Sequence, residues 1–409
     1  RLMNWNWATT TSESSDTPLI LQQLLEGGYL RDDQHPAVIV HNLVQFERRL
    51  AYLQNIFPLS TLHTLAIKAN PLPGLLCAGV EKGFGLEAAS IGELALAESV
   101  GCPPERVVFD SPAKTRAELR HAAAVGYTVN ANSAAELQRI KQLGLKNFPL
   151  GLRINPVVAD TSRESSTMVA ALNSKFGVTL EQAALLIKEH PEISGLHVHV
   201  GSQVATLDDL ALAAQRLVGL ARAHPQIEWL DIGGGLPVRY RSDDPGLDPK
   251  DYYTALQKAA PELVLYSLLT EMGRAIQANC GIAVSRVEYV TQERAILHFG
   301  ADLAVRECYQ SEAWHHEFEA FDSSGLPKRG EPVPYDLYGP LCFSGDRLAK
   351  ARRLPALQES DLIVMHDIGA YTLGMWSRYC SRPLPEVLGW DGTALSVLRS
   401  RETAEQVAR

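Results

Sequence analysis

The sequence predicts an α/β protein in which an eight-stranded β/α barrel is followed by a smaller β-rich domain. Three observations predict this arrangement. Between residues 43 and 275, short apolar runs alternate with amphipathic helical segments, as in repeated βα units. Eight such runs occur, which is the strand number of a closed β/α barrel. After about residue 275, apolar and polar residues alternate with period two, and Pro and Gly separate the runs, as is typical of β-strands.

The barrel pattern begins with a helical segment, residues 42–57, in which Leu43, Phe46, Leu50 and Leu53 form one apolar stripe. Eight apolar runs follow it. They are residues 64–67, 84–88, 106–109, 127–130, 150–154, 195–200, 228–232 and 263–269. The same runs are also compatible with a doubly wound open sheet, and the pattern alone leaves that alternative open.

The domain boundaries follow from these changes in pattern. Residues 1–36 are expected to be an N-terminal arm, mobile over its first 16 residues, and residues 37–42 a strand that joins the β domain. Residues 43–275 are expected to form the barrel, with a polar segment at 158–173 as a mobile loop. Residues 276–409 are expected to form the β domain, which is then built from both ends of the chain.

Composition narrows the class of function. The chain has 409 residues, of which 46% are hydrophobic and 21% charged, enough for one large domain and a smaller one. The net charge of -9 and the lack of long basic runs argue against nucleic acid or an anionic membrane surface as partner. No apolar stretch reaches the roughly 18 residues that a transmembrane helix requires. A small-molecule ligand is therefore expected.

Cysteine usage indicates the cellular compartment. Six cysteines are scattered along the chain without a C-x-x-C pair. This pattern favours reduced thiols in the cytoplasm over a disulfide framework or a zinc site, so no metal is expected.

Polar and ionisable residues stand where the apolar runs stop. They are Lys68, Glu87, Asn130, Arg153, His199, residues 233–235 (Gly-Gly-Gly) and Glu271. The carboxyl ends of barrel strands converge on one mouth, where catalytic groups of such proteins lie. Each residue alone has a plain structural explanation, such as a solvated cap or a hydrogen-bonded core group. Their joint placement favours one ionisable cavity.

Lys68 and the three glycines together suggest a particular cofactor. A lysine amine in a partly desolvated cavity has its neutral form favoured and can form a Schiff base with an aldehyde. The N–H groups of a glycine turn can surround a phosphate. Pyridoxal 5'-phosphate (PLP) is an aldehyde phosphate that also needs a partner for its ring nitrogen, which Glu271 can supply. Arg274, three residues later, could add a charged hydrogen bond to the phosphate.

Six ordered motifs resemble one known family. They are "AIKANP", "HVHVGSQ", "LDIGGGLP", "EMGRAI", "GPLCFSGD" and "DIGAYT". The chain resembles fold-type III PLP-dependent decarboxylases, the group of diaminopimelate, ornithine, arginine and carboxynorspermidine decarboxylases, from about residue 37 to about residue 380. The resemblance implies an alanine-racemase-type (β/α)8 barrel, a C-terminal β-barrel-like domain, and a homodimer whose active sites lie at the subunit interface.

The resemblance also implies roles for individual residues. It makes Lys68 the Schiff-base lysine, His199 the imidazole that stacks on the ring, and Glu271 the partner of the pyridine nitrogen. Cys342, contributed by the partner subunit, would protonate the carbanion after carbon dioxide leaves. Further cofactor contacts are implied for Glu87, Arg153, Ser202, Gly233, Gly234, Gly235, Arg274 and Tyr371. Substrate contacts are implied for Cys342, Phe343, Asp346 and Tyr371.

Three positions depart from the family pattern. Met272 replaces a proline of the EPGR motif, and Gln203 replaces a glycine, which would place a polar group near the cofactor. Phe343 follows the cysteine, where diaminopimelate and ornithine decarboxylases usually carry a carboxylate that binds the distal ammonium of the substrate. Either Asp346 takes over this role or the substrate differs at its distal end, as in a modified or polyamine-like amino acid.

The function predicted is therefore PLP-dependent decarboxylation of an amino acid, with diaminopimelate decarboxylation to lysine as an alternative. A racemase on the same barrel is a rival, although "GPLCFSGD" supplies a cysteine where racemases use a tyrosine. A cofactor-free regulatory homologue is a rival from another class. A sugar-phosphate lyase with a lysine Schiff base leaves the C-terminal β domain unexplained.

Overall fold

The computed structural model of this chain describes residues 5–158, 169–170, 174–204, 206–244 and 246–409. Most of the segment 158–173, expected to be a mobile loop, lies outside these ranges. The chain divides into two compact units, which are described separately below. The β unit comprises Arg1–Phe46, Arg239–Pro245 and Ile276–Arg409, and the barrel unit comprises Glu47–Val238 and Gly246–Ala275.

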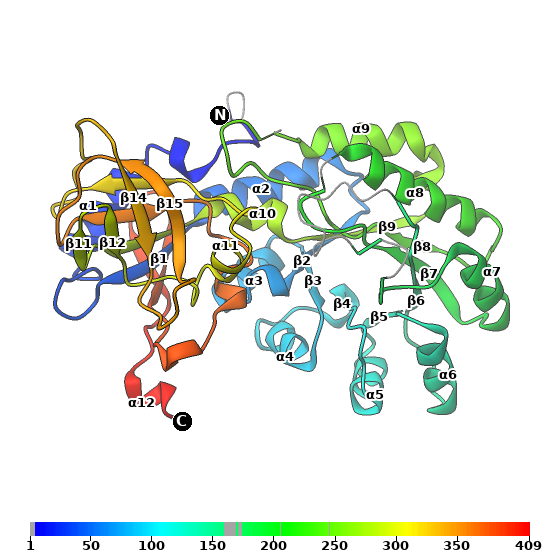
Figure 1. Cartoon of the computed structure of the whole chain (residues 1–409). Coiled ribbons are helices and arrows are strands. Elements are labelled where there is room, and N and C mark those ends of the chain that lie inside the picture. Colours follow the sequence, from blue (N-terminus) through cyan, green and yellow to red (C-terminus); the bar gives the residue numbers. More distant parts are fainter. Residues whose placement is uncertain (1–4, 159–168, 171–173, 205, 245) are drawn as a thin grey trace. The chain divides into compact units, whose positions relative to one another are not determined.

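Eight parallel strands close into a barrel in the barrel unit (Figure 1). The predicted barrel is thereby confirmed, and the open doubly wound sheet is wrong. In order around the barrel, the strands are β2 (Leu62–Ala66), β3 (Gly85–Ala88), β4 (Val107–Phe109), β5 (Thr128–Ala131), β6 (Leu150–Ile154), β7 (Ile193–Val198), β8 (Trp229–Asp231) and β9 (Ser267–Met272). β9 pairs with β2, which closes the ring.

Helices follow the strands, as expected of βα units (Figure 1). They are α3 (Pro73–Glu81), α4 (Ile91–Ser99), α5 (Arg116–Val125), α6 (Ala134–Gln142), α7 (Leu180–Glu189), α8 (Leu207–Arg222) and α9 (Pro249–Ala259), with α2 (Leu43–Ile56) before the first barrel strand and α10 (Arg274–Gln277) after the last. Many of these helices start at a side-chain cap. In α5, for example, the Thr115 hydroxyl accepts a hydrogen bond from the Glu118 N–H, and the Glu118 carboxylate accepts one from the Thr115 N–H.

The eighth strand lies further along the chain than the apolar run suggested. Pro261–Leu265 forms a 3₁₀ turn, and the strand runs from Ser267 to Met272. Pro261 sits in the first turn of this 3₁₀ segment, where its missing N–H costs nothing, and the exposed side chains of Val264 and Leu265 do not contribute to the core. Glu271 is consequently part of β9 rather than a residue beyond its end.

The barrel interior is filled at one level by a single large side chain. Trp229 of β8 packs with Val108 and Leu269. A Cβ atom added to Gly195 of β7 would lie 2.0 Å from the Trp229 ring, and one added to Gly151 of β6 would lie 2.5 Å from it. Both strands therefore need glycine here, because any side chain would occupy the space of the indole.

The β unit contains two sheets. The six-stranded sheet has the order β13 (Phe318–Phe321), β16 (Leu362–Met365), β10 (Gly281–Arg286), β1 (Ala37–Asn42), β17 (Glu386–Trp390) and β18 (Leu395–Arg399). The four-stranded sheet has the order β11 (Tyr289–Thr291), β12 (Arg294–Ile296), β14 (Val333–Tyr338) and β15 (Arg347–Leu354). β1 pairs antiparallel with β10 and parallel with β17, so a strand from near the N-terminus lies inside a sheet made of C-terminal strands.

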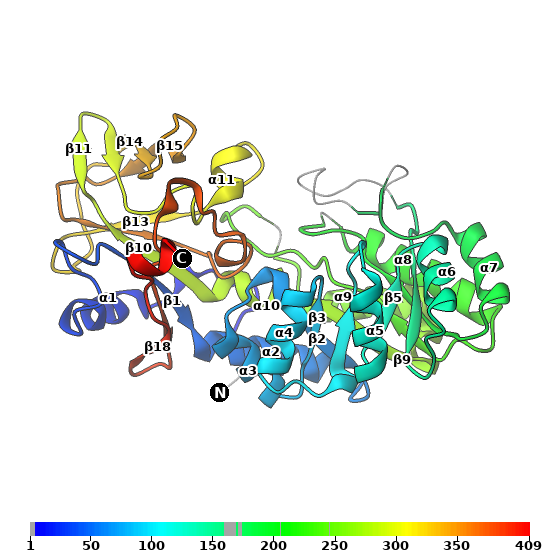
Figure 2. The same ribbon diagram turned by 90° about the horizontal axis from the view of Figure 1, so that it is seen from below.

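The described N-terminal residues are packed, which differs from the mobile arm expected over residues 1–16. The Thr11 N–H donates to Asp367 Oδ1 (2.8 Å), and the Thr11 hydroxyl accepts the Asp367 N–H (2.8 Å). The next helix, α1 (Thr17–Glu26), lies next to β1 (Figure 2). Its Leu21 and Leu24 side chains are buried in the core of the six-stranded sheet. The apolar spacing of this helix was the signal that the sequence offered.

Two further helices of the β unit are short: α11 (Val305–Tyr309) and α12 (Ala404–Val407). Among the described residues, every helix is too short or too polar to cross a bilayer.

The contact between Gly195 and Trp229 gives a test of the barrel core. We expect Gly195→Ala to lower the free energy of unfolding by about 1–3 kcal/mol, because the new methyl group overpacks the indole. Gly219 is the matched control, since it lies in α8 with open space around its Cα. Gly219→Ala should be neutral or stabilise by up to about 1 kcal/mol through helix propensity. Urea unfolding measures both, and equal effects of the two substitutions would contradict the packing described.

Candidate active site

Lys68 lies directly beyond the first barrel strand, in a 3₁₀ turn of residues Ile67–Ala69. Its amine pairs with the carboxylate of Glu87 from β3. Glu87 is buried, and burial raises its pKa to about 7, an effect that the charge of Lys68 partly offsets. The Lys68 side chain is 41% exposed, so the amine is more accessible than the desolvated cavity predicted from sequence.

His199 follows β7 and is held by the backbone. Its Nδ1 accepts the N–H of Gly234 at 3.1 Å. Burial, together with the positive charge of Arg153, keeps the pKa of His199 well below its usual value, so the imidazole is neutral. A neutral ring whose Nδ1 accepts a hydrogen bond carries its proton on Nε2. The glycine turn therefore selects the tautomer of His199.

The glycine turn (residues 233–235) requires glycine at each position. Cβ atoms added to Gly233, Gly234 and Gly235 would lie 2.3 Å from Val198 O, 2.1 Å from Glu271 O and 2.5 Å from Gly201 O. Gly233 and Gly235 also have left-handed φ values of 66° and 107°. The turn thus passes very close to the backbone of the loop after β7 and of β9.

Two N–H groups of this turn are already in use. Gly233 N–H donates to Asp231 Oδ1 at 2.9 Å, and Gly234 N–H donates to His199 Nδ1. Gly233 and Gly234 therefore organise the turn through Asp231 and His199, a role that the expectation of direct phosphate contacts did not include.

Ser202 and Arg274, both expected to contact a phosphate, lie within hydrogen-bonding distance of each other. Arg274 begins α10 directly after β9, and its Nε donates to Ser202 Oγ at 3.2 Å. Arg274 is buried, so its charge acts in a medium of low polarity. Arg153 of β6 is also buried, with its guanidinium 4.3 Å from the centre of the Phe176 ring.

Gln203 does not offer a polar group to a cofactor. Its Nε2 donates to Val238 O at 2.7 Å, and its Oε1 accepts Val238 N–H at 3.0 Å. Both ends of the amide are used by one backbone residue. The expectation that Gln203 adds a polar group near the cofactor is therefore wrong, because this side chain ties its loop to the segment after the glycine turn.

Three buried residues of the barrel escaped the sequence reasoning: Asp110, His197 and Asp231. His197 Nε2 lies 3.2 Å from Glu271 Oε1 and 3.5 Å from Asp110 Oδ2. Asp110 comes directly after β4. The polar residues predicted at strand ends included Glu87 at β3, Asn130 at β5 and Arg153 at β6, but none at β4. In "HVHV", His197 lies two residues before His199, so in a strand both side chains point to the same face. This alternation could have indicated that His197 also belongs to the site.

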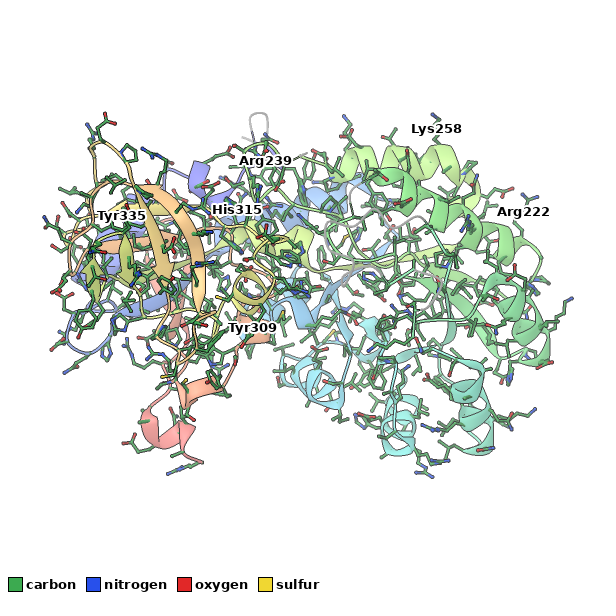
Figure 3. The ribbon with its side chains drawn as sticks, in the orientation of Figure 1. Arg222, Arg239, Lys258, Tyr309, His315 and Tyr335 are labelled. Carbon is green, nitrogen blue, oxygen red and sulfur yellow. The ribbon has the colours of Figure 1, made fainter. Side chains whose placement is uncertain are left out.

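The remaining predicted residues belong to the β unit. Cys342 and Phe343 lie in the cysteine loop (residues 339–346), where Cys342 is exposed. The Phe343 ring stacks on Tyr309 of α11 (centroids 5.4 Å apart, 14° between planes) and meets Tyr379 edge-on at 5.9 Å (Figure 3 labels Tyr309). We call Tyr309, Phe343 and Tyr379 the aromatic cluster.

Asp346 cannot replace the missing carboxylate. Its Oδ1 accepts Ala301 N–H and its Oδ2 accepts Leu341 N–H, both at 2.6 Å, and the side chain is buried. A Cβ atom on Gly300 would lie 2.1 Å from the same carboxylate. The expectation that Asp346 takes over recognition of a substrate ammonium is wrong, because this carboxylate holds the cysteine loop in shape.

Tyr371 also lies in the β unit. It has a left-handed φ of 57°, which is costly for a residue with a side chain, and its ring lies 4.9 Å from the Arg306 guanidinium. A strained backbone conformation of this kind persists only where the surrounding structure fixes it.

The barrel residues fit PLP. Lys68 supplies an amine at a strand end, and Ser202 with Arg274 supplies donors for a phosphate. Glu271 supplies a buried carboxylate oxygen, Oε1, that lacks a hydrogen-bond partner among the described residues.

Comparisons with known proteins agree with this fit. The family model of the pyridoxal-dependent decarboxylases, pyridoxal binding domain, matches residues 43–278. Diaminopimelate decarboxylase of Pseudomonas aeruginosa is 33% identical over 87% of this chain and 88% of its own length. The enzyme of Vibrio cholerae is 34% identical over 82% and 83%. The crystal structure of diaminopimelate decarboxylase from Helicobacter pylori, complexed with L-lysine, has a TM-score of 0.85 and 25% identity, covering 92% of this chain and 96% of that one.

The family model spans more than half of the chain, and both relatives exceed 30% identity over most of it. The closed barrel, the lysine at its first strand end and the glycine turn are the features from which the sequence predicted a PLP site. The chain therefore belongs to the fold-type III PLP-dependent decarboxylases and is an amino acid carboxy-lyase that uses pyridoxal 5'-phosphate.

Proposed function

We propose that this enzyme decarboxylates an α-amino acid whose distal end is not a free ammonium group. The observation that carries the proposal is the cysteine loop: Phe343 occupies the position after Cys342, and the Asp346 carboxylate is used by two backbone N–H groups. A substrate ammonium without a partner in a desolvated pocket loses roughly 1.5–3 kcal/mol of binding free energy, the contribution of a hydrogen bond to a charged group. An acylated or otherwise uncharged distal group loses nothing there and can pack on the aromatic cluster.

The residues of the barrel unit have the following proposed roles. Lys68 Nζ would hold the cofactor, and Glu87, with its raised pKa, would take or return a proton beside this amine. Ser202 and Arg274 hold the phosphate. His199 contacts the ring as a neutral imidazole, and Glu271 faces the ring nitrogen. When bound, PLP accepts the electron pair left on Cα after carbon dioxide departs.

The β unit supplies the last proton in this proposal. Cys342 Sγ donates it to Cα, and the exposed position of the thiol is compatible with access to a substrate. We further propose that the chain forms a homodimer in which the cysteine loop of one subunit completes the barrel site of the other. Tyr371 is proposed to contribute to the same shared site.

Diaminopimelate is the first alternative substrate, because the relatives named above are diaminopimelate decarboxylases. It has a free distal ammonium, and the loop carboxylate that the family resemblance implies for it is missing from this chain. The pair of diaminopimelate and its derivative acylated on the distal nitrogen therefore separates the two possibilities.

We expect the wild-type enzyme to release carbon dioxide from the acylated compound with the higher kcat/KM. Phe343→Glu should reverse this order by roughly 10- to 100-fold in the ratio of the two kcat/KM values, because it restores a charged partner for the ammonium. Phe343→Gln is the matched control, as it has the same shape without the charge, and it should not favour the free ammonium. A wild-type preference for unmodified diaminopimelate would refute the proposed substrate class.

The shared site predicts complementation between two inactive variants. Lys68→Ala removes the covalent anchor, and Cys342→Ala removes the proton donor, so each homodimer should be inactive. Mixing them under conditions that exchange subunits should restore activity, because one site of the mixed dimer then contains both residues. Sedimentation analysis checks that dimers form. Dimers that exchange without any recovery of carbon dioxide release would show that each subunit's site uses its own Cys342.

A further inference from the structure

Four buried ionisable groups from four barrel strands or strand ends meet inside the barrel. They are Asp110 after β4, His197 in β7, Asp231 in β8 and Glu271 in β9, and all four are buried. His197 Nε2 lies within 3.5 Å of both Asp110 and Glu271. Asp110 and Asp231 both lie close enough to Glu271 for its charge to raise their pKa values. We call these residues the acid cluster.

The acid cluster cannot carry three negative charges. A buried carboxylate without a cationic partner costs several kcal/mol, and neighbouring like charges add to that cost. The nearby lysines are already paired: Lys68 with Glu87, and Lys114 with Glu136 at 2.8 Å. Arg153 is the cation that acts on Asp110, which is enough to balance one carboxylate. Two of the three acids are therefore neutral.

Backbone and amide donors decide which oxygens bear the protons. Asp231 Oδ1 accepts the Gly233 N–H at 2.9 Å, and Asp110 Oδ1 accepts from Asn130 Nδ2 at 2.8 Å. Each acid has one oxygen fixed as an acceptor, which leaves Oδ2 to carry the proton and act as donor. Asp231 Oδ2 has no other partner among the described side chains and backbone groups. Both acids thus present a donor toward Glu271.

The titration behaviour agrees with this arrangement. Burial, and then the charge of Glu271, raises the pKa of Asp110 to about 6 and that of Asp231 well above its usual value. Burial lowers the pKa of His197 to about 3, so the imidazole is neutral and has one N–H. The ionisable groups that interact with Asp110 are Glu271 from β9, Asp231 from β8, His197 from β7, Arg153 from β6 and Glu87 from β3.

We propose that Asp231 and His197, together with Asp110 while it holds its proton, are uncharged positioning residues that hold Glu271 as the anion of the acid cluster. Protonated Asp110 and Asp231 donate to the Glu271 carboxylate and fix its orientation, and the neutral imidazole of His197 lies beside it, with Nε2 3.2 Å from Oε1. The consequence for cofactor binding rests on the proposed role of Glu271 at the ring nitrogen: one anion, held in place, faces that nitrogen, and its neighbours do not compete for the ring's proton.

A different ligand would explain the same geometry. Asp110, His197 and Glu271 offer ligand atoms that all lie within 4.8 Å of one another, a spacing at which a metal ion can bind. Bound metal would require Asp110 and Glu271 to be ionised together. Metal analysis of the purified enzyme therefore separates the two explanations, and stoichiometric metal in this cluster would overturn the proposal.

The test replaces each neutral acid by its amide in the full-length, cofactor-free chain. Asp110→Asn and Asp231→Asn keep one acceptor and one donor in the arrangement described, while Asp110→Ala removes both. Because the folded state binds the Asp110 proton more tightly than the unfolded state, wild-type stability is lost as pH rises from the usual pKa toward about 6. Asp110→Asn has no such loss, so its melting temperature should exceed that of wild type increasingly up to about pH 6 and by a constant amount above it.

Asp391→Asn is the contrasting control, because backbone and side-chain hydrogen bonds lower the pKa of this exposed carboxyl group, which lies in the β unit. Its melting temperature should therefore change relative to wild type in the opposite direction as pH rises, and only below about pH 4. Asp110→Ala should melt below wild type at every pH. Asp110→Asn melting as low as Asp110→Ala, without the pH trend, would show that Asp110 is ionised and overturn the proposal. Asp231→Asn repeats the test at an independent position.

Cofactor binding provides the second readout. We expect the PLP dissociation constant to change little in Asp110→Asn and to rise roughly tenfold in Asp110→Ala, the effect of one lost hydrogen bond to a charged group. If the pH trend of the cofactor-free chain appears but PLP binding and the absorption band of the bound cofactor are unchanged in Asp110→Ala, the acid cluster is as proposed and the role of Glu271 at the ring nitrogen is wrong. Failure of the pH trend itself refutes the acid cluster.

Discussion

The site depends on the close approach between the glycine turn and the backbone of Glu271. Glu271 N–H donates to Gly233 O at 2.8 Å, and a methyl group on Gly234 would lie 2.1 Å from Glu271 O. Only glycine permits this contact. Once it is made, the turn's own N–H groups are aimed at His199 and Asp231. The contact between the glycine turn and the Glu271 backbone therefore fixes both the tautomer of His199 and the orientation of the Asp231 carboxyl group.

A second constraint follows from burial. The barrel encloses more acids than cations at the carboxyl ends of its strands, and low polarity makes every uncompensated charge expensive. The chain meets this constraint by pairing Lys68 with Glu87 and Lys114 with Glu136, and by leaving other acids protonated. Protonated acids are donors, so a set of groups that looks strongly anionic in the sequence has a structure with little net charge. A count of formal charges from residue types would therefore overestimate the negative charge of this cavity.

Much of the fold could be predicted because its signals are local. Each of the first seven apolar runs overlaps a strand, and the glycine motif lies where the turn was expected. The shift of β9 was not predictable from apolarity, since Val264 and Leu265 are apolar yet exposed. For the site, motif residues such as Lys68 and His199 were found by position. Asp110 and Asp231 were not, because a single acid after a strand resembles a solvated cap until its neighbours are known.

The cysteine loop shows why a motif alone does not define specificity. "GPLCFSGD" retains an acid at Asp346, and by sequence that acid was a candidate for the ammonium partner that Phe343 displaced. The structure assigns Asp346 to the two N–H groups that shape the loop, and Gly300 and Gly339 leave space for its carboxylate. A carboxylate with both oxygens committed to buried N–H groups cannot turn to a substrate without leaving them unpaired, at about 1–3 kcal/mol each. With Phe343 next to Cys342, the loop has no second carboxylate beside that of Asp346.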